Sequence, residues 1–142
     1  MKKLIGATVA LMVGLAAAAH ADQGGHVKIT RSVNVDMNDS MRFSPSAISV
    51  KAGEVIRFVV KNSGKTKHEM VIGDAAELME HAQAMAKFPA MEHEEHNQVT
   101  LAPGATGTIV WKFDKAGKVD FACLQPGHFE AGMKGQIEVS AK

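Results

Sequence analysis

From Val27 onwards the chain alternates between apolar and polar residues with the period of a half-buried strand. Valine or isoleucine occupies most odd positions of residues 27–35, and the alternation returns at residues 48–50 before a turn at residues 51–53. Alternation of this kind predicts strands with one face in a core. Residues 55–60 form a nearly continuous apolar run, which predicts a strand covered on both faces.

Further short apolar segments follow, separated by turn residues. Their sequences are HEMVIG (68–73), NQVTL (97–101), GTIVWKF (107–113), KVDFACL (118–124) and GQIEVS (135–140). The pairs Pro103-Gly104 and Ala116-Gly117 are typical of turns. Seven or eight short strands joined by such turns predict an all-β sandwich or barrel, with Trp111 and Phe113 in or near its core.

Residues 74–96 interrupt the strand pattern and predict an insertion of one helix and a loop. Asp74 with a glutamate three residues later is a helix N-terminal signature, and Pro89 ends the helical spacing. The segment is rich in acids, histidine and methionine. Either Leu78 and the methionines pack the helix on the sandwich while the acids and histidines face water, or these side chains bind a metal.

The first residues of the chain are typical of an exported protein. Two lysines precede an apolar run that ends in Ala19-His20-Ala21, a pattern that signal peptidase cleaves. The run is short for a membrane-spanning helix, which needs about 20 residues. We therefore expect a signal peptide at residues 1–21 and a periplasmic domain at residues 22–142.

Charge and cysteine content exclude several kinds of partner. Loss of the two signal-peptide lysines takes the formal charge from +1 to near −1, so neither nucleic acid nor a membrane surface is expected as a partner. The remaining chain has the length of one domain, and we expect a monomer. The only cysteine, Cys123, has no partner for an internal disulfide, so it is buried, joined to another molecule or bound to a metal.

Cys123 belongs to a regularly spaced group of soft metal ligands. His128 follows it by five residues, and Met133 follows His128 by five. A thiolate, two imidazoles and a weak thioether form the mononuclear site of blue-copper proteins. The second histidine must come from another strand, and His68 is the best candidate. We therefore predict a copper site formed by His68, Cys123, His128 and Met133.

These motifs resemble those of the cupredoxins, the plastocyanin and azurin superfamily. Asn-x-Gly-x-x-x-His at residues 62–68 resembles the strand of that family's first ligand. Cys-x4-His-x4-Met at residues 123–133 resembles its ligand loop, with the spacing of rusticyanin and auracyanin. The resemblance covers nearly all of the mature chain except the insertion, and it implies a Greek-key β-sandwich with one type 1 copper and one-electron transfer. Asn62 and Glu69 are near the ligands in sequence and are candidates to tune the site.

Two enzymatic alternatives fit the sequence less well. Cys123 and His128 resemble the nucleophile and base of a hydrolase, but no acid or amide is placed to orient the histidine. Multicopper oxidases and copper nitrite reductases use further histidine motifs, and this chain contains no His-x-His or His-Cys-His. We therefore expect no enzymatic activity.

Two roles remain open for a copper protein of this kind. One is a soluble electron carrier, and the resemblance implies that a redox partner docks near His128, on a patch formed by Pro126, Gly127, Phe129 and Ala131. The other is copper tolerance, because the chain also resembles small periplasmic cupredoxins that have this role and carry stretches rich in methionine and histidine. We favour copper tolerance.

The insertion supplies candidates for a second, weaker copper site. His81 and Met85 are four residues apart and share one helix face, and Met91, His93 and His96 follow the helix. Nearby acids favour a cation, although salt screens exposed charges. We therefore predict a second copper site drawn from these five residues, separate from the first.

Overall fold

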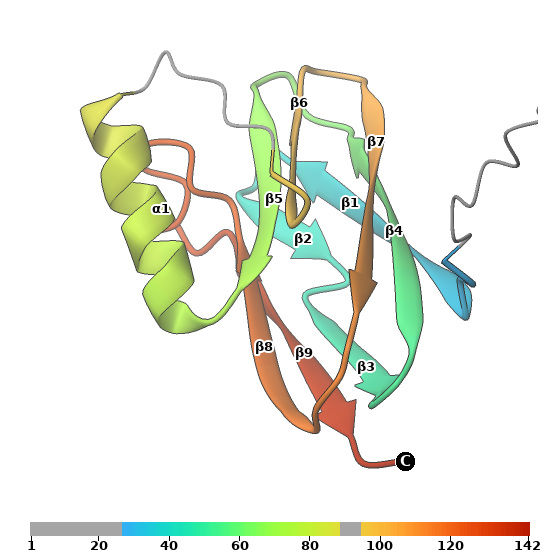
Figure 1. The fold of residues 1–142 in the computed structure, drawn as a ribbon. Coiled ribbons are helices and arrows are strands. Elements are labelled where there is room, and N and C mark those ends of the chain that lie inside the picture. Colours follow the sequence, from blue (N-terminus) through green and yellow to red (C-terminus); the bar gives the residue numbers. More distant parts are fainter. Residues whose placement is uncertain (1–26, 89–94) are drawn as a thin grey trace, which may run out of the picture.

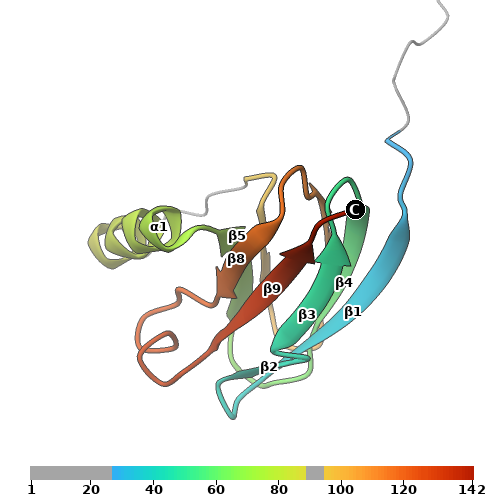
Figure 2. The ribbon, with the colours of Figure 1, turned by 90° about the horizontal axis from the view of Figure 1, so that it is seen from below.

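The computed structural model describes residues 27–88 and 95–142, so the predicted signal peptide lies outside the described residues (Figure 1). The described chain forms two packed β-sheets with one helix beside them (Figures 1 and 2). The elements are β1 (Arg31–Asn38), β2 (Arg42–Ser44), β3 (Ala47–Lys51), β4 (Val55–Asn62), β5 (His68–Gly73), α1 (Ala75–Lys87), β6 (Gln98–Leu101), β7 (Thr106–Lys112), β8 (Gly117–Ala122) and β9 (Lys134–Ser140).

The strand order shows a sandwich in which the chain crosses repeatedly between the sheets. One sheet has the order β2-β1-β4-β7, and the other has the order β3-β9-β8-β5-β6. β1 is parallel to β4 and β3 is parallel to β9, whereas the other neighbouring strands are antiparallel. Parallel neighbours cannot be joined by a tight hairpin. The predicted all-β sandwich is confirmed.

Strand bounds differ from the prediction at the start of the sandwich. The first strand begins at Arg31 rather than at Val27, which is 63% exposed. The strand β2 is an addition to the predicted set, and it brings the described residues to nine strands. It contains three residues of which only Phe43 is buried. A segment this short gives no periodic signal in the sequence.

β5 is buried along its whole length because both of its faces are covered. Met70 and Ile72 belong to the core between the sheets, and Val71 packs in a second cluster on the other face. The core also contains Phe113, and Trp111 is half-buried against it, as predicted. The first residue of β5 is therefore held firmly within the sandwich.

The helix α1 lies where the insertion was predicted, against β5 and β8 (Figure 2). The carboxylate of Asp74 accepts hydrogen bonds from the N–H groups of Ala76 and Glu77, and the Glu77 carboxylate accepts one from the N–H of Asp74. Leu78 and Met85 are buried. These contacts confirm the predicted helix start and the predicted packing of Leu78 and Met85, whereas Met79, also predicted to pack, is 52% exposed.

No helix in the described part of the chain is long and apolar enough to cross a membrane.

The two ends of the insertion lie side by side in the sheet. The N–H of Ile72 donates to the carbonyl of Asn97 (2.9 Å), and the side-chain amide of Asn97 donates to the carbonyl of Ile72 (2.9 Å). β5 and β6 are antiparallel neighbours. The chain therefore leaves and re-enters the sheet at the same point.

Candidate metal centre

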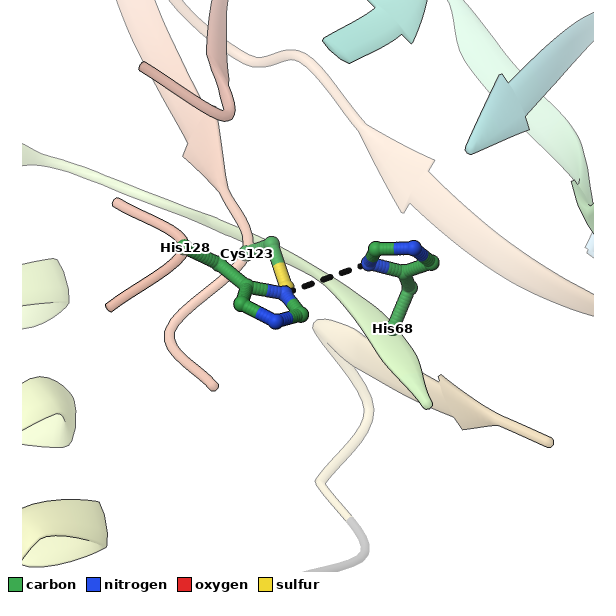
Figure 3. A group of neighbouring side chains, drawn as sticks. All are labelled: His68, Cys123 and His128. Atoms are coloured by element: carbon green, nitrogen blue, oxygen red, sulfur yellow. Dashed lines mark hydrogen bonds between the residues drawn. The ribbon is translucent and has the colours of Figure 1, made fainter. Parts of the chain in front are cut away.

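Three side chains from distant parts of the sequence meet in one cluster (Figure 3). His68 begins β5, Cys123 follows β8, and His128 lies in the loop between β8 and β9. Their ligand atoms all lie within 4.8 Å of one another. His128 Nδ1 is 3.2 Å from Cys123 Sγ and 3.2 Å from His68 Nδ1. Two nitrogens and a sulfur this close are arranged to hold one metal ion.

The sheet register explains why His68 meets the ligand loop. β5 and β8 are antiparallel neighbours with Val71 opposite Ala122, so the start of β5 lies beside the chain that follows Cys123. Side chains alternate between faces along a strand. This alternation places His68 on the same face as Met70, which belongs to the core.

Backbone hydrogen bonds close the loop that carries the other predicted ligands. The N–H of Cys123 donates to the carbonyl of Met133 (3.0 Å), and the N–H of Met133 donates to the carbonyl of His128 (3.0 Å). Gly127 and Gly132 have φ angles of 83° and 97°, which favour glycine. Met133 is fully buried. The loop therefore fixes the backbone of all three predicted ligands relative to one another.

The thiol of Cys123 is fully buried and contacts a backbone donor. Burial raises its pKa to about 12, while the N–H of Glu69, 3.4 Å from Sγ, partly offsets this effect. The pKa of His128 is lowered, first by burial and then by the neighbouring His68. At neutral pH the metal-free cluster therefore contains a protonated thiol and a neutral His128.

The second nitrogen of His68 faces a carboxylate. Its Nε2 lies 3.0 Å from Asp39 Oδ1 and 3.3 Å from Thr66 Oγ1. The N–H of Lys65 donates to Asp39 Oδ2 (2.7 Å), and this bond, ahead of the one with His68, lowers the pKa of Asp39 to about 2. Asp39 has no signal in the sequence, because 29 residues separate it from His68 and only the fold brings the two together.

Asn62, a predicted neighbour of the ligands, holds the turn that leads to His68. Its side-chain amide donates to the carbonyls of Thr66 (2.8 Å) and Leu101 (3.0 Å). Its side-chain oxygen accepts a hydrogen bond from the N–H of Gly64 (2.9 Å). Asn62 therefore fixes the backbone of the first-ligand motif.

Glu69, the other predicted neighbour, connects three parts of the site. Its carboxylate is 1% exposed and accepts hydrogen bonds from the N–H of Leu124 (3.0 Å) and the side chain of Gln125 (3.2 Å). His81 Nε2 of α1 lies 3.9 Å from the same carboxylate. Glu69 therefore ties β5 to the ligand loop and to the inserted helix.

The residues predicted for a second copper site lie in several environments. Met85 is buried, and the ring of His96 stacks on Trp111 with centroids 5.5 Å apart and planes at 7°. Met91 and His93 lie outside the described residues. His81 and His96 line one cavity of about 400 Å³, together with the acids Glu77, Glu80 and Glu95. Among the described residues, the one cluster of three or more His, Cys, Asp or Glu donors is that of His68, Cys123 and His128.

The patch predicted to receive a redox partner borders a groove. Pro126, Gly127 and Ala131 are exposed, and Phe129 is half-buried. A cavity of about 980 Å³ lies between this loop and α1, where Met79 is among the lining residues. Partner docking at this patch stays a prediction.

A β-sandwich with this cluster of two histidines and a cysteine defines a cupredoxin. The chain belongs to the plastocyanin/azurin family of copper-binding proteins, whose model matches residues 29–140. It is 51% identical over 116 residues to the copper-resistant cuproprotein CopI of Rubrivivax gelatinosus, covering 82% of this chain and 70% of that protein. The protein of the same name from Pseudomonas aeruginosa is 37% identical, covering 78% of this chain and 76% of that protein.

Solved structures of auracyanins have the same fold. Reduced auracyanin from Roseiflexus castenholzii superposes with a TM-score of 0.67 at 20% identity, covering 80% of this chain and 99% of that chain. Auracyanin B superposes with a TM-score of 0.66 at 23% identity, covering 80% of this chain and 91% of that chain. The predicted resemblance to cupredoxins is confirmed.

Proposed function

We propose that this protein is a periplasmic type 1 copper protein that serves copper tolerance through one-electron chemistry. The observation that carries the proposal is the convergence of two imidazoles and one buried thiol within 4.8 Å, which is the donor set of blue-copper sites. The relatives named copper-resistant cuproproteins support a role in tolerance. The periplasmic location rests on the predicted signal peptide at residues 1–21.

Four residues hold the metal in this proposal. His68 and His128 bind through Nδ1, Cys123 binds as the thiolate, and Met133 is a weaker sulfur ligand. Bound copper supplies the couple between Cu(I) and Cu(II). The closed ligand loop and the N–H of Glu69 hold the donors in place, so the protein rearranges little when the oxidation state changes.

Copper uptake is expected to release about one proton per ion between about pH 7 and 9. The thiol of Cys123 keeps its proton over this range because its pKa is about 12, and the metal requires the thiolate. His128 is already neutral, since its pKa is lowered. The apparent affinity therefore rises about tenfold for each unit of increasing pH. Calorimetric titration in buffers of different ionisation enthalpy counts the protons, and a count near zero contradicts a Cys123 thiol that is protonated in the metal-free protein.

A simple electron carrier is the second candidate function. The exposed Pro126 and Gly127 next to His128 favour it, because they offer a docking surface for a redox partner beside a ligand. The cupredoxin fold is typical of electron carriers rather than of enzymes, so we propose that the protein is not catalytic. We also propose that it is a monomer.

A second copper site in the insertion separates the two functions. We propose that it is drawn from His81, Met85, Met91, His93 and His96, and the cavity shared by His81 and His96 supports this. A protein that handles excess copper benefits from extra binding capacity, whereas a simple carrier needs one copper.

Titration with Cu(I) and Cu(II) tests this proposal in three proteins. They are the mature wild type, a variant with His81, His93 and His96 replaced by alanine, and the control Met79→Leu, which alters an exposed helix residue outside the predicted set. We expect more than one copper in the wild type and in the control, one copper in the triple variant, and lower copper tolerance of cells that carry the triple variant. One copper in all three proteins with unchanged tolerance removes the second site and favours the simple carrier.

A further inference from the structure

The ring of His68 is held between the metal cluster and a carboxylate outside the ligand motifs. Its Nδ1 faces His128, and its Nε2 lies 3.0 Å from Oδ1 of Asp39. The His68 side chain is fully buried, and that of Asp39 is 37% exposed. A histidine that donates one N–H to a carboxylate keeps its other nitrogen free for a metal.

Asp39 is itself fixed in place by the turn that precedes His68. Its Oδ2 accepts the N–H of Lys65 (2.7 Å), and its Oδ1 accepts the N–H (3.3 Å) and the hydroxyl (3.0 Å) of Thr66. Gly64 packs against the pair, since a Cβ there would lie 3.1 Å from His68 Nε2 and would collide with the Asp39 carboxylate. The carboxylate is therefore positioned by the same turn that delivers the ligand.

We propose that Asp39 is a positioning residue that orients His68 and lowers the reduction potential of the copper centre. The proposal rests on the proposed role of His68 as a ligand. A carboxylate that accepts the Nε2–H bond fixes the tautomer and makes the ligating nitrogen more basic. Its negative charge also stabilises Cu(II) more than Cu(I), because the Coulomb energy grows with the charge of the ion.

Thr66 offers the competing explanation. Its hydroxyl oxygen lies 3.3 Å from His68 Nε2 and is a second acceptor in reach. The same hydroxyl is 3.0 Å from Asp39 Oδ1, to which it donates. The substitution Thr66→Val removes this oxygen at similar volume while it leaves the carboxylate in place. It therefore distinguishes the two acceptors.

Three variants test the role of the carboxylate. Asp39→Asn removes its charge, and Thr66→Val removes the competing acceptor. Asp36→Asn removes the same charge from a residue three positions earlier, which accepts a hydrogen bond from Ser63 (2.7 Å). The readouts are ¹⁵N NMR of the His68 ring in the copper-free protein and the reduction potential of the copper-loaded protein. The backbone amide spectrum checks that each variant is folded.

We expect the wild-type copper-free ring to carry its proton on Nε2. In Asp39→Asn the Nε2–H signal shifts, and the preference for Cu(II) over Cu(I) falls about tenfold, which is a rise of about 59 mV for one electron. Asp36→Asn and Thr66→Val change this preference less than about threefold. A wild-type proton on Nδ1, an Asp39→Asn potential within the range of Asp36→Asn, or an equal effect of Thr66→Val overturns the proposal.

These readouts also separate this proposal from the proposed function. Absence of a copper–thiolate band in the wild type contradicts the function, whereas the NMR experiment on the copper-free protein still decides whether Asp39 holds the His68 ring. A normal copper site with an unaffected potential in Asp39→Asn contradicts only the role of Asp39.

Discussion

Replacing Cys123 by alanine is expected to abolish the intense visible absorption of the copper-loaded protein while the sandwich stays folded. At the proposed site this absorption would arise from charge transfer between the Cys123 thiolate and copper, and Cys123 is the only thiol in the chain. The substitution removes one buried sulfur from a core that keeps all of its large aromatic and aliphatic side chains. Visible spectroscopy measures the band, and circular dichroism measures the fold.

Met133→Leu is the matched control for this experiment. It removes the other predicted sulfur ligand but keeps the thiolate, so we expect copper to remain bound and the visible band to persist. The reduction potential rises, because an apolar neighbour disfavours Cu(II). An unchanged visible spectrum in Cys123→Ala refutes a copper–thiolate site, and a lowered potential in Met133→Leu contradicts the role given to the thioether.

Phe121→Ala is expected to lower the free energy of unfolding of the copper-free protein by about 3–5 kcal/mol. Phe121 is fully buried on β8, two residues before Cys123. Its ring packs edge-on against Phe43 at 5.0 Å between centroids and 75° between planes. Removal of the ring leaves a cavity between the sheets that the surrounding strands fill only in part. Urea denaturation followed by tryptophan fluorescence measures the change.

Phe129→Ala is the control for ring removal outside the core. Phe129 is half-buried in the ligand loop, where Lys134 Nζ lies 4.9 Å from the ring centre. The ring is partly buried against the second cluster rather than in the core between the sheets, so we expect a smaller loss than in Phe121→Ala, of about 1–2 kcal/mol. Equal losses in the two variants would mean that the core between the sheets does not dominate stability.

The three residues of the ligand cluster were predictable because each belongs to a recognisable motif in its own part of the sequence. Cys123 and His128 lie five residues apart on one loop, and His68 begins a strand with a clear apolar pattern. The convergence of their donor atoms follows from the pairing of β5 with β8. Asp39 was not predictable, since it lies in an ordinary turn after β1 and reaches His68 only through the packing of the two sheets.

The inserted helix shows the same limit. Its start was predictable from the capping residues Asp74 and Glu77, and its packing from Leu78 and Met85. Helical spacing shows which residues share a face, but the partner of each face depends on the sheet beneath it. The approach of His81 to the buried Glu69 therefore had no signal in the sequence.

The insertion leaves the sheet and returns to it at two residues that are hydrogen-bonded to each other. The hydrogen bonds between Ile72 and Asn97 already pair the two ends of the insertion in the sheet, so the length of the segment can change without a shift in the register of β5 as long as Leu78 still covers that strand. His68 then keeps its place, because the pairing of β5 with β8 sets it. Evolution and protein engineering can therefore diversify the exposed positions of this segment, whereas Leu78 and His81 couple the helix to β5 and to the ligand loop.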